Sequence, residues 1–175
     1  MEAVETVRAR YRPGRITTLF VGESAPQSGD FFYCGNNAML RHMQRAVEQV
    51  LPKSDDFLKS FKAYGWYLDD LVLTPVNHLT GSERIAKCQD AQKSLADRIA
   101  AYRPEAIVSL LISIEPFVDA AAIAASSNAP RYAVPFPGMG QQARFQDAMA
   151  SIIPKLPRLT GQQSNSPGVV ACSRK

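Results

Sequence analysis

The stretch TLFVGESAPQSGDFFY, residues 18–33, decides how the rest of the chain is organised. An apolar run over residues 16–21 changes abruptly at Gly22 into a polar loop marked by Gly and Pro. A short apolar run that stops at a turn signal predicts a buried strand. Glu23 and Ser24 then lie just past the carboxyl end of that strand, which is where open α/β sheets bind their ligands.

Three adjacent aromatic residues, Phe31, Phe32 and Tyr33, close this stretch. One buried face cannot absorb three consecutive rings, so we expect at least one of them to be exposed or to line a pocket. Together with the carboxylate of Glu23 and the hydroxyl of Ser24, such a ring predicts a loop suited to a flat polar ligand such as a nucleobase.

Strands and helices alternate along the rest of the chain. Apolar runs predict further strands at residues 66–73, 106–112 and 132–134. Helical spacing of apolar residues predicts helices at 2–11, 40–51, 55–64, 81–101, 114–126 and 141–153. This alternation predicts an α/β fold, a three-layer sandwich around a four-stranded parallel sheet with helices on both faces. The loops at residues 22–33, 74–78 and 135–140 then gather at one edge of the sheet.

Several of the predicted helices carry side chains that can cap their first turn. The candidates are Asn36 or Asn37, Ser54, Thr80 in a capping box with Glu83, and Ser113. Cys88 falls on the apolar line of the helix that follows Thr80, so we expect it in the core rather than as a nucleophile.

Two consecutive acids, Asp69 and Asp70, end the second predicted strand and place one carboxylate on each face of the sheet. A buried unpaired carboxylate is costly, so at least one of them should lie near the polar rim or a pocket. The alternative is that one carboxylate caps a helix or pairs with an arginine while the other faces solvent.

Length and composition favour one folded domain over residues 1–158, because the chain has 175 residues of which 46% are hydrophobic. Residues 159–175 predict a disordered basic tail. The last 21 residues hold four of the 20 Lys and Arg and no acid, so the remaining 16 balance the 16 acids. The net charge of +4 therefore says little about the folded part.

Other classes of protein are disfavoured by what the sequence contains. No apolar run approaches the length of a membrane span, and the start MEAVETVRAR does not resemble a signal peptide, so we expect a cytoplasmic protein. Cys34, Cys88 and Cys172 are too scattered for a disulfide framework or a zinc site. We expect no metal, no other cofactor and no membrane partner, and a monomer.

Over residues 16–154 the order of these loops resembles the uracil-DNA glycosylase superfamily, most of all its thermophilic-type branch. The segment GESAP, residues 22–26, is similar to the first motif Gly-Glu-x-Pro-Gly, with Pro one place later. Phe32, eight residues before Leu40, resembles the Phe that stacks on the base. Phe136-Pro137-Gly138 stands in the place of the second motif, His-Pro-Ser, which stabilises the leaving base and inserts into DNA.

Between these motifs, Asp69 or Asp70 falls where the family has an Asn at a strand end that binds the base edge. Pro75 with Asn77 resembles the Pro-x-x-Asn stretch that follows it. The chain departs from the family in two further respects. Phe136 replaces the His of the second motif, and the cysteines that hold the iron-sulfur cluster of the thermophilic-type branch have no counterparts, Leu73 standing near one such place.

The resemblance implies a DNA partner and hydrolysis of the N-glycosidic bond of a flipped-out damaged base such as uracil. Its catalytic candidates are Glu23, which orients water or stabilises the sugar cation, and Ser24. Its substrate-binding candidates are Gly22, Phe32, Asp70, Asn77, His78, Phe136 and Gly138, with His78 as the candidate replacement for the missing motif His. The alternative is a catalytically inactive nucleobase- or nucleic-acid-binding protein of the same fold.

Overall fold

A computed structural model describes residues 3–35 and 37–159. Six α-helices and four strands follow one another in this part of the chain, joined by three short 3-10 helices. The helices are α1 (Val4–Arg10), α2 (Ala38–Glu48), α3 (Phe57–Ala63), α4 (Gly81–Tyr102), α5 (Glu115–Ala124) and α6 (Gln142–Ile152). The strands are β1 (Thr18–Gly22), β2 (Trp66–Asp70), β3 (Ala106–Ser109) and β4 (Arg131–Ala133). The 3-10 helices are η1 (Phe32–Cys34), η2 (Ile112–Ile114) and η3 (Ile153–Lys155).

The four strands form one parallel sheet in the order β2-β1-β3-β4. Thr18 of the central strand β1 is in register with Trp66 on one side and with Ala106 on the other. β3 is buried along its whole length, as a strand covered on both faces must be. The predicted fold is confirmed. β1, β2 and β3 are shorter than the apolar runs that predicted them, and β4 has the predicted length but begins one residue earlier.

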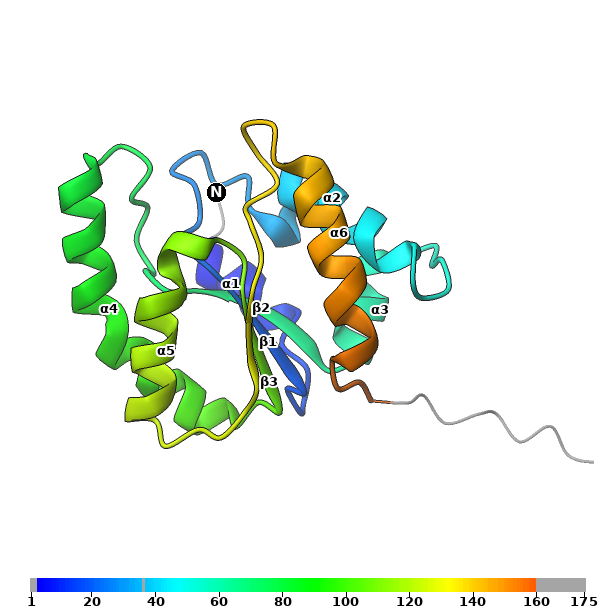
Figure 1. The fold of residues 1–175 in the computed structure, drawn as a ribbon. Coiled ribbons are helices and arrows are strands. Elements are labelled where there is room, and N and C mark those ends of the chain that lie inside the picture. The colour runs from blue at the N-terminus through cyan, green and yellow to red at the C-terminus, as the bar shows by residue number, and fades with distance from the viewer. Residues whose placement is uncertain (1–2, 36, 160–175) are drawn as a thin grey trace, which may run out of the picture.

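Helices cover both faces of the sheet and make the molecule three layers deep (Figure 1). α2, α3 and α6 lie on one side, where α2 packs on α6. α4 and α5 pack against each other on the other side. The chain therefore leaves β1 toward one layer and β3 toward the other, and these two strands are neighbours. Such a divergence is the place where open α/β sheets leave a crevice for ligands.

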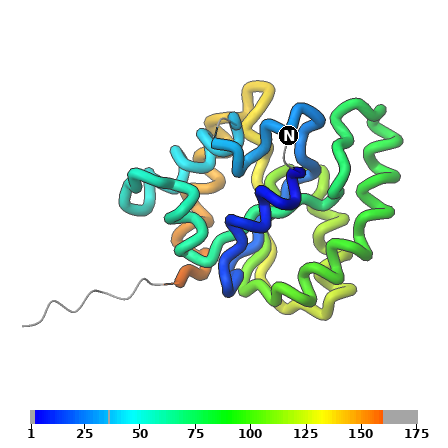
Figure 2. Tube along the Cα trace, turned by 180° about the vertical axis from the view of Figure 1, so that it is seen from behind, coloured from blue at the N-terminus to red at the C-terminus, as the bar shows by residue number. Residues whose placement is uncertain are grey.

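The N-terminal helix α1 and η1 lie beside the edge strand β2. Seen from behind, α1 runs between α4 and the layer that holds α3 (Figure 2). Tyr33 of η1 donates its hydroxyl to the Leu68 carbonyl at 3.1 Å and accepts the Leu68 N–H at 2.7 Å. One phenol thus satisfies both backbone groups that this residue turns away from the sheet, which protects an edge that is otherwise open to pairing.

Two of the predicted caps are confirmed and two are wrong. Asn37 caps α2, and Thr80 forms the capping box with Glu83 at the start of α4. α3 is capped by Asp56 instead of Ser54, whose hydroxyl bonds to Asp56. α5 has no side-chain cap, because the predicted cap Ser113 lies within η2 and the helix begins only at Glu115.

The last described residues are tied to the start of the sheet. The Pro157 carbonyl lies 2.9 Å from the Thr17 hydroxyl, 3.0 Å from the Thr18 hydroxyl and 2.9 Å from the Trp66 indole nitrogen. The Leu159 N–H donates to the Tyr64 carbonyl at 2.9 Å, so Leu159 is not part of a tail as predicted. The rest of the predicted tail, 160–175, lies outside the described residues. In the described residues no helix is both long and apolar enough to cross a membrane.

Candidate functional site at the carboxyl edge of the sheet

The loop after β1 is fastened to the loop after β2, so Glu23 has a fixed position at the end of the central strand. The Gly22 carbonyl accepts the Leu71 N–H at 2.8 Å, and the Glu23 carbonyl accepts the Val72 N–H at 2.9 Å. The ladder between the two strands thus continues past their ends. The Ser24 hydroxyl oxygen accepts the Val76 N–H at 3.2 Å, which joins the loops again and leaves Ser24 with a structural contact where we expected a catalytic one.

The carboxylate of Glu23 is bound by Arg84, which lies in the first turns of α4. Arg84 Nε donates to Glu23 Oε1 at 3.2 Å, and Nη2 donates to Oε2, so the pair is bidentate. The Glu23 side chain is 18% exposed and that of Arg84 is 39% exposed. The hydrogen bond to Glu23 raises the pKa of Arg84. This edge of the sheet therefore carries the Glu23 carboxylate, which is mostly buried and is paired with the partly exposed guanidinium of Arg84.

Cys88 follows Arg84 by one turn of α4 and is buried, as predicted. Burial raises the pKa of its thiol, and the charge of Glu23 adds to that effect. A thiol with a raised pKa is a poor nucleophile at neutral pH, so Cys88 acts as a small apolar side chain of the core.

The three consecutive rings are all buried, and the expectation that one of them lines a pocket is wrong. Phe31, Phe32 and Tyr33 are each 3% exposed. Phe32 packs on Phe61 of α3 with 5.2 Å between ring centroids, while Tyr33 stacks on Tyr11 next to α1 at 4.9 Å. A 3-10 helix turns about 120° per residue, so neighbouring side chains face different elements. Phe32 is thus in the core, which removes the ring that was expected to stack on a base.

Asp69 and Asp70 are both buried, and the expected role of Asp70 in binding a base edge does not fit its surroundings. Arg8 of α1 binds both carboxylates, with Nη1 at 3.0 Å from Asp69 Oδ1 and Nη2 at 2.7 Å from Asp70 Oδ2. Arg98 of α4 holds Asp69 from the other side at 2.5 Å. The two acids therefore join α1 and α4 to β2, and neither faces solvent.

The charges of this buried cluster depend on one another. Burial raises the pKa of Asp70, and the adjacent Arg8 lowers it by less, so the net shift is upward. For Arg8, burial lowers the pKa, but the charges of Asp70 and Asp69 together outweigh it and raise the pKa. The exposed Glu5 adds a third carboxylate at 3.3 Å from Arg8 Nε. The cluster is a structural ion-pair network rather than a substrate site.

The remaining predicted residues lie on exposed loops at the carboxyl edge. Asn77 and His78 are exposed in the loop that precedes α4. Phe136 is 48% exposed and its ring covers Gly138, where a Cβ atom would lie 2.9 Å from the ring carbon Cε1. Met139, the next residue, is 100% exposed and has a positive φ of 50°. The corner after β4 therefore presents two apolar side chains to solvent.

Further exposed apolar residues surround the same edge of the sheet. Leu73 follows β2 at 44% exposure, and Ile112 follows β3 at 50%. With Phe136 and Met139 they form an apolar rim, which we define as Leu73, Ile112, Phe136 and Met139. In Figure 1 the loops after β1, β2 and β4 rise above the same end of the sheet. Each residue of the apolar rim follows a strand, so all four lie at the edge of the sheet that also carries Glu23 and Arg84.

Three arginines with defined partners were not among the predicted site residues. Arg8 lies four residues after Val4 and three before Tyr11, so its place on an apolar helical stripe was a usable signal. Arg84 and Arg98 follow no such pattern, because a helix in contact with a distant loop leaves no mark in the local sequence. Two hollows in the described part of the chain also lie elsewhere, one on α2 and one at the opposite edge of the sheet.

Within residues 3–35 and 37–159 no three His, Cys, Asp or Glu side chains lie close enough together to hold a metal ion. No protein-family model matches this chain, and no curated protein is similar to it in sequence. The function must therefore be argued from the geometry of the carboxyl edge.

Proposed function

We propose that this protein is a DNA glycosylase-like hydrolase, which takes a flipped-out base at the carboxyl edge of its sheet and hydrolyses the N-glycosidic bond. The observation that carries this proposal is the placement of Glu23. Its carboxylate is fixed at the end of the central strand, largely shielded from water and paired with a cation that solvent can reach. The similarity of the surrounding motif to that of the uracil-DNA glycosylase superfamily supports the same assignment.

Cleavage of an N-glycosidic bond builds positive charge on the sugar and negative charge on the departing base. A carboxylate beside the sugar stabilises that cation and orients the attacking water, whose proton it accepts. In the free protein Arg84 neutralises Glu23. We propose that a backbone phosphate of the bound strand takes over Arg84, because phosphate is a strong partner for a guanidinium, and that this leaves Glu23 charged beside the sugar. Backbone N–H groups after Gly138 then face the departing base.

The test is an excision assay on single- and double-stranded DNA that contains uracil, hypoxanthine or xanthine. We expect excision of at least one base by the wild type and a loss of about 100-fold or more in rate for Glu23→Gln, which keeps the size of the side chain but removes its charge. Asp147→Asn, an exposed acid on α6, is the matched control and should excise at the wild-type rate. A Glu23→Gln variant that cuts as fast as the wild type contradicts the mechanism.

A second candidate, a protein that retains a base without cutting, is favoured by Phe136. This half-exposed ring stands where the related motif has a histidine that donates to the base anion, so the developing charge lacks a side-chain donor there. Under this candidate, wild-type protein binds abasic or base-modified DNA at low salt without excision, and Phe136→Ala weakens that binding. No DNA affinity at low salt would contradict both candidates.

The Phe136→His variant tests whether the missing donor limits catalysis. It restores an imidazole N–H at the corner after β4, and we expect it to raise the excision rate by about tenfold or more. Phe136→Leu is the control that changes the ring without adding a donor. Equal rates for the two variants would show that the corner does not act on the departing base.

A further inference from the structure

A hollow of about 560 Å³ lies at the amino edge of the sheet, opposite the carboxyl edge. It is lined by residues 12–16, which lead into β1, and by residues 101–103, which end α4 before β3. Its size falls within the range of small-molecule sites in proteins, about 300–1,000 Å³. The proposed function makes no use of this place.

Three arginines, Arg12, Arg15 and Arg103, line this hollow. Arg15 pairs with Glu105 at 2.6 Å, with both side chains at the surface. Burial raises the pKa of Tyr102, and the neighbouring guanidinium of Arg12 lowers it by less. Arg12 lines the hollow and forms no ion pair with an acid among the described residues. Arg103 is exposed at the end of α4 and likewise pairs with no acid in the described part of the chain. Glu105 balances the charge of Arg15, while Arg12 and Arg103 leave the hollow with a net positive charge.

The end of helix α4 explains the presence of Arg103 at this hollow, but it does not explain the presence of Arg12 and Arg15. The carbonyl end of a helix carries a partial negative charge, which favours a basic residue such as Arg103 directly after its last turn. Arg12 and Arg15 come from a separate segment, where Pro13 is buried and fixes the chain between them. The charge of the helix end therefore does not explain why Arg12 and Arg15 lie at the same hollow as Arg103, and this set of arginines favours an anionic ligand.

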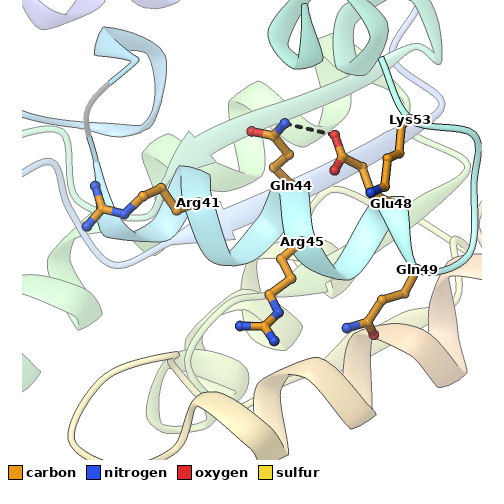
Figure 3. A pocket seen from close by; sticks show the side chains of 6 residues that line it. All are labelled: Arg41, Gln44, Arg45, Glu48, Gln49 and Lys53. Carbon is orange, nitrogen blue, oxygen red and sulfur yellow. Dashed lines mark hydrogen bonds between the residues drawn. The ribbon is translucent and has the colours of Figure 1, made fainter. Parts of the chain in front are cut away.

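The hollow on α2 can be compared with the hollow at the amino edge, because it is also lined by basic residues. It measures about 300 Å³ and lies on the exposed face of α2, lined by Arg41, Gln44, Arg45, Glu48, Gln49 and Lys53 (Figure 3). Glu48 stands among these cations and accepts a hydrogen bond from Gln44 at 2.8 Å. All but Lys53 of its lining residues come from α2 or the residue after it, so this hollow is a feature of one helix surface. The amino-edge hollow, built by two segments, is the stronger candidate.

We propose that the amino-edge hollow binds a phosphate group through Arg12, Arg15 and Arg103. Guanidinium groups bind phosphate oxygens in pairs, and three of them around one hollow favour a multiply charged anion. Tyr102 is partly exposed and lines the same hollow as Arg12, so part of an aromatic ring belongs to the wall of the hollow. The phosphate belongs either to a small nucleotide-sized anion or to a nucleic-acid backbone, which share this chemistry.

The test measures binding of inorganic pyrophosphate to the full chain by calorimetry at low salt. We expect saturable binding to the wild type, and at least about tenfold weaker binding to the double variant Arg12→Gln/Arg103→Gln. Arg45→Gln removes a cation from the other hollow and should stay within about twofold of the wild type. Circular dichroism before each titration confirms that the variants are folded, and Arg12→Gln alone serves if the double variant is not.

Competition by a single-stranded oligothymidylate then identifies the source of the phosphate. Displacement of pyrophosphate, with affinity that falls steeply as salt is added, assigns the site to a nucleic-acid backbone. Binding of pyrophosphate without competition assigns it to a small anion, and both results support the proposal. Equal affinity of the double variant and the wild type for pyrophosphate, or no saturable binding by the wild type, would overturn it. Neither result bears on excision at the opposite edge.

Discussion

At the scale of single residues, buried charge has the largest consequences in this protein. Arg8 is one of the most completely buried large side chains, and it holds the carboxylates of Asp69 and Asp70. A buried ion pair contributes little by comparison with apolar packing, but removing one partner leaves an uncompensated charge in the core. The identity of residue 8 therefore decides whether α1 can cover the edge of the sheet.

Replacement of Arg8 by Met should lower the free energy of unfolding by about 3–5 kcal/mol at neutral pH. Burial already raises the pKa of Asp70 above its ordinary value, and loss of Arg8 raises it further. A folded-state pKa above the unfolded one means that protonation favours the folded state. The difference in free energy of unfolding between the wild type and the variant should therefore become smaller as the pH falls from about 7 to about 5.

Urea denaturation at several pH values checks this prediction. Arg45→Met, which changes an exposed arginine on α2, is the control and should show neither the loss nor the pH dependence. A deficit in Arg8→Met that grows toward acid pH would contradict the assigned direction of the Asp70 pKa.

At the scale of elements, α4 supports the candidate site more than any other helix. It presents Arg84 to Glu23 and Arg98 to Asp69, so two separate parts of the carboxyl edge depend on where this helix begins. Its start is set by the capping box of Thr80 and Glu83. The hydrogen bonds of Thr80 lower the pKa of Glu83. Loss of this capping box would therefore displace Arg84, which binds Glu23.

Thr80→Ala should lower the free energy of unfolding by about 1 kcal/mol, because the Glu83 N–H in the first turn loses the Thr80 hydroxyl that accepts it. Ser94→Ala, within the same helix and exposed, is the control and should cause no loss. Chemical denaturation of both variants and of the wild type gives the free energies of unfolding to be compared. A loss for Ser94→Ala equal to that for Thr80→Ala would show that the loss does not come from the cap, because Ala has a higher helix propensity than Ser.

At the scale of the whole molecule, the two edges of the sheet are chemically different. The carboxyl edge has the apolar rim and the pair of Glu23 and Arg84, whereas the amino edge has the arginine hollow and the attachment of the last described residues. A parallel sheet makes this separation possible, since every strand ends at one edge and begins at the other. The two proposed sites can therefore be removed independently.

A chain that ends at Lys155 should be less stable than one that ends at Leu159 by about 3 kcal/mol or more. It loses the buried side chain of Leu156 and the carbonyl of Pro157, which leaves the indole N–H of Trp66 without its acceptor. Thermal and urea unfolding of the two truncated chains give the comparison. Equal stability would show that the bonds to Pro157 contribute nothing.

The sequence by itself determined the class of fold, the order of strands and helices, the core position of Cys88 and the caps at Asn37 and Thr80. All of these follow from periodicity and local hydrogen bonding, which neighbouring residues settle among themselves. It also placed Glu23 at the end of the first strand, because a strand boundary is a local feature.

Only the tertiary structure decided which side chains meet. The rings of Phe31, Phe32 and Tyr33 are all buried because α1, α3 and β2 each supply a surface for them, and these elements are distant in sequence. Asp70 was expected at a substrate and is bound by Arg8, which lies 62 residues away along the chain. The pairing of Glu23 with Arg84 has the same origin. Contacts of this kind depend on how the layers pack, and no local pattern of residues encodes that.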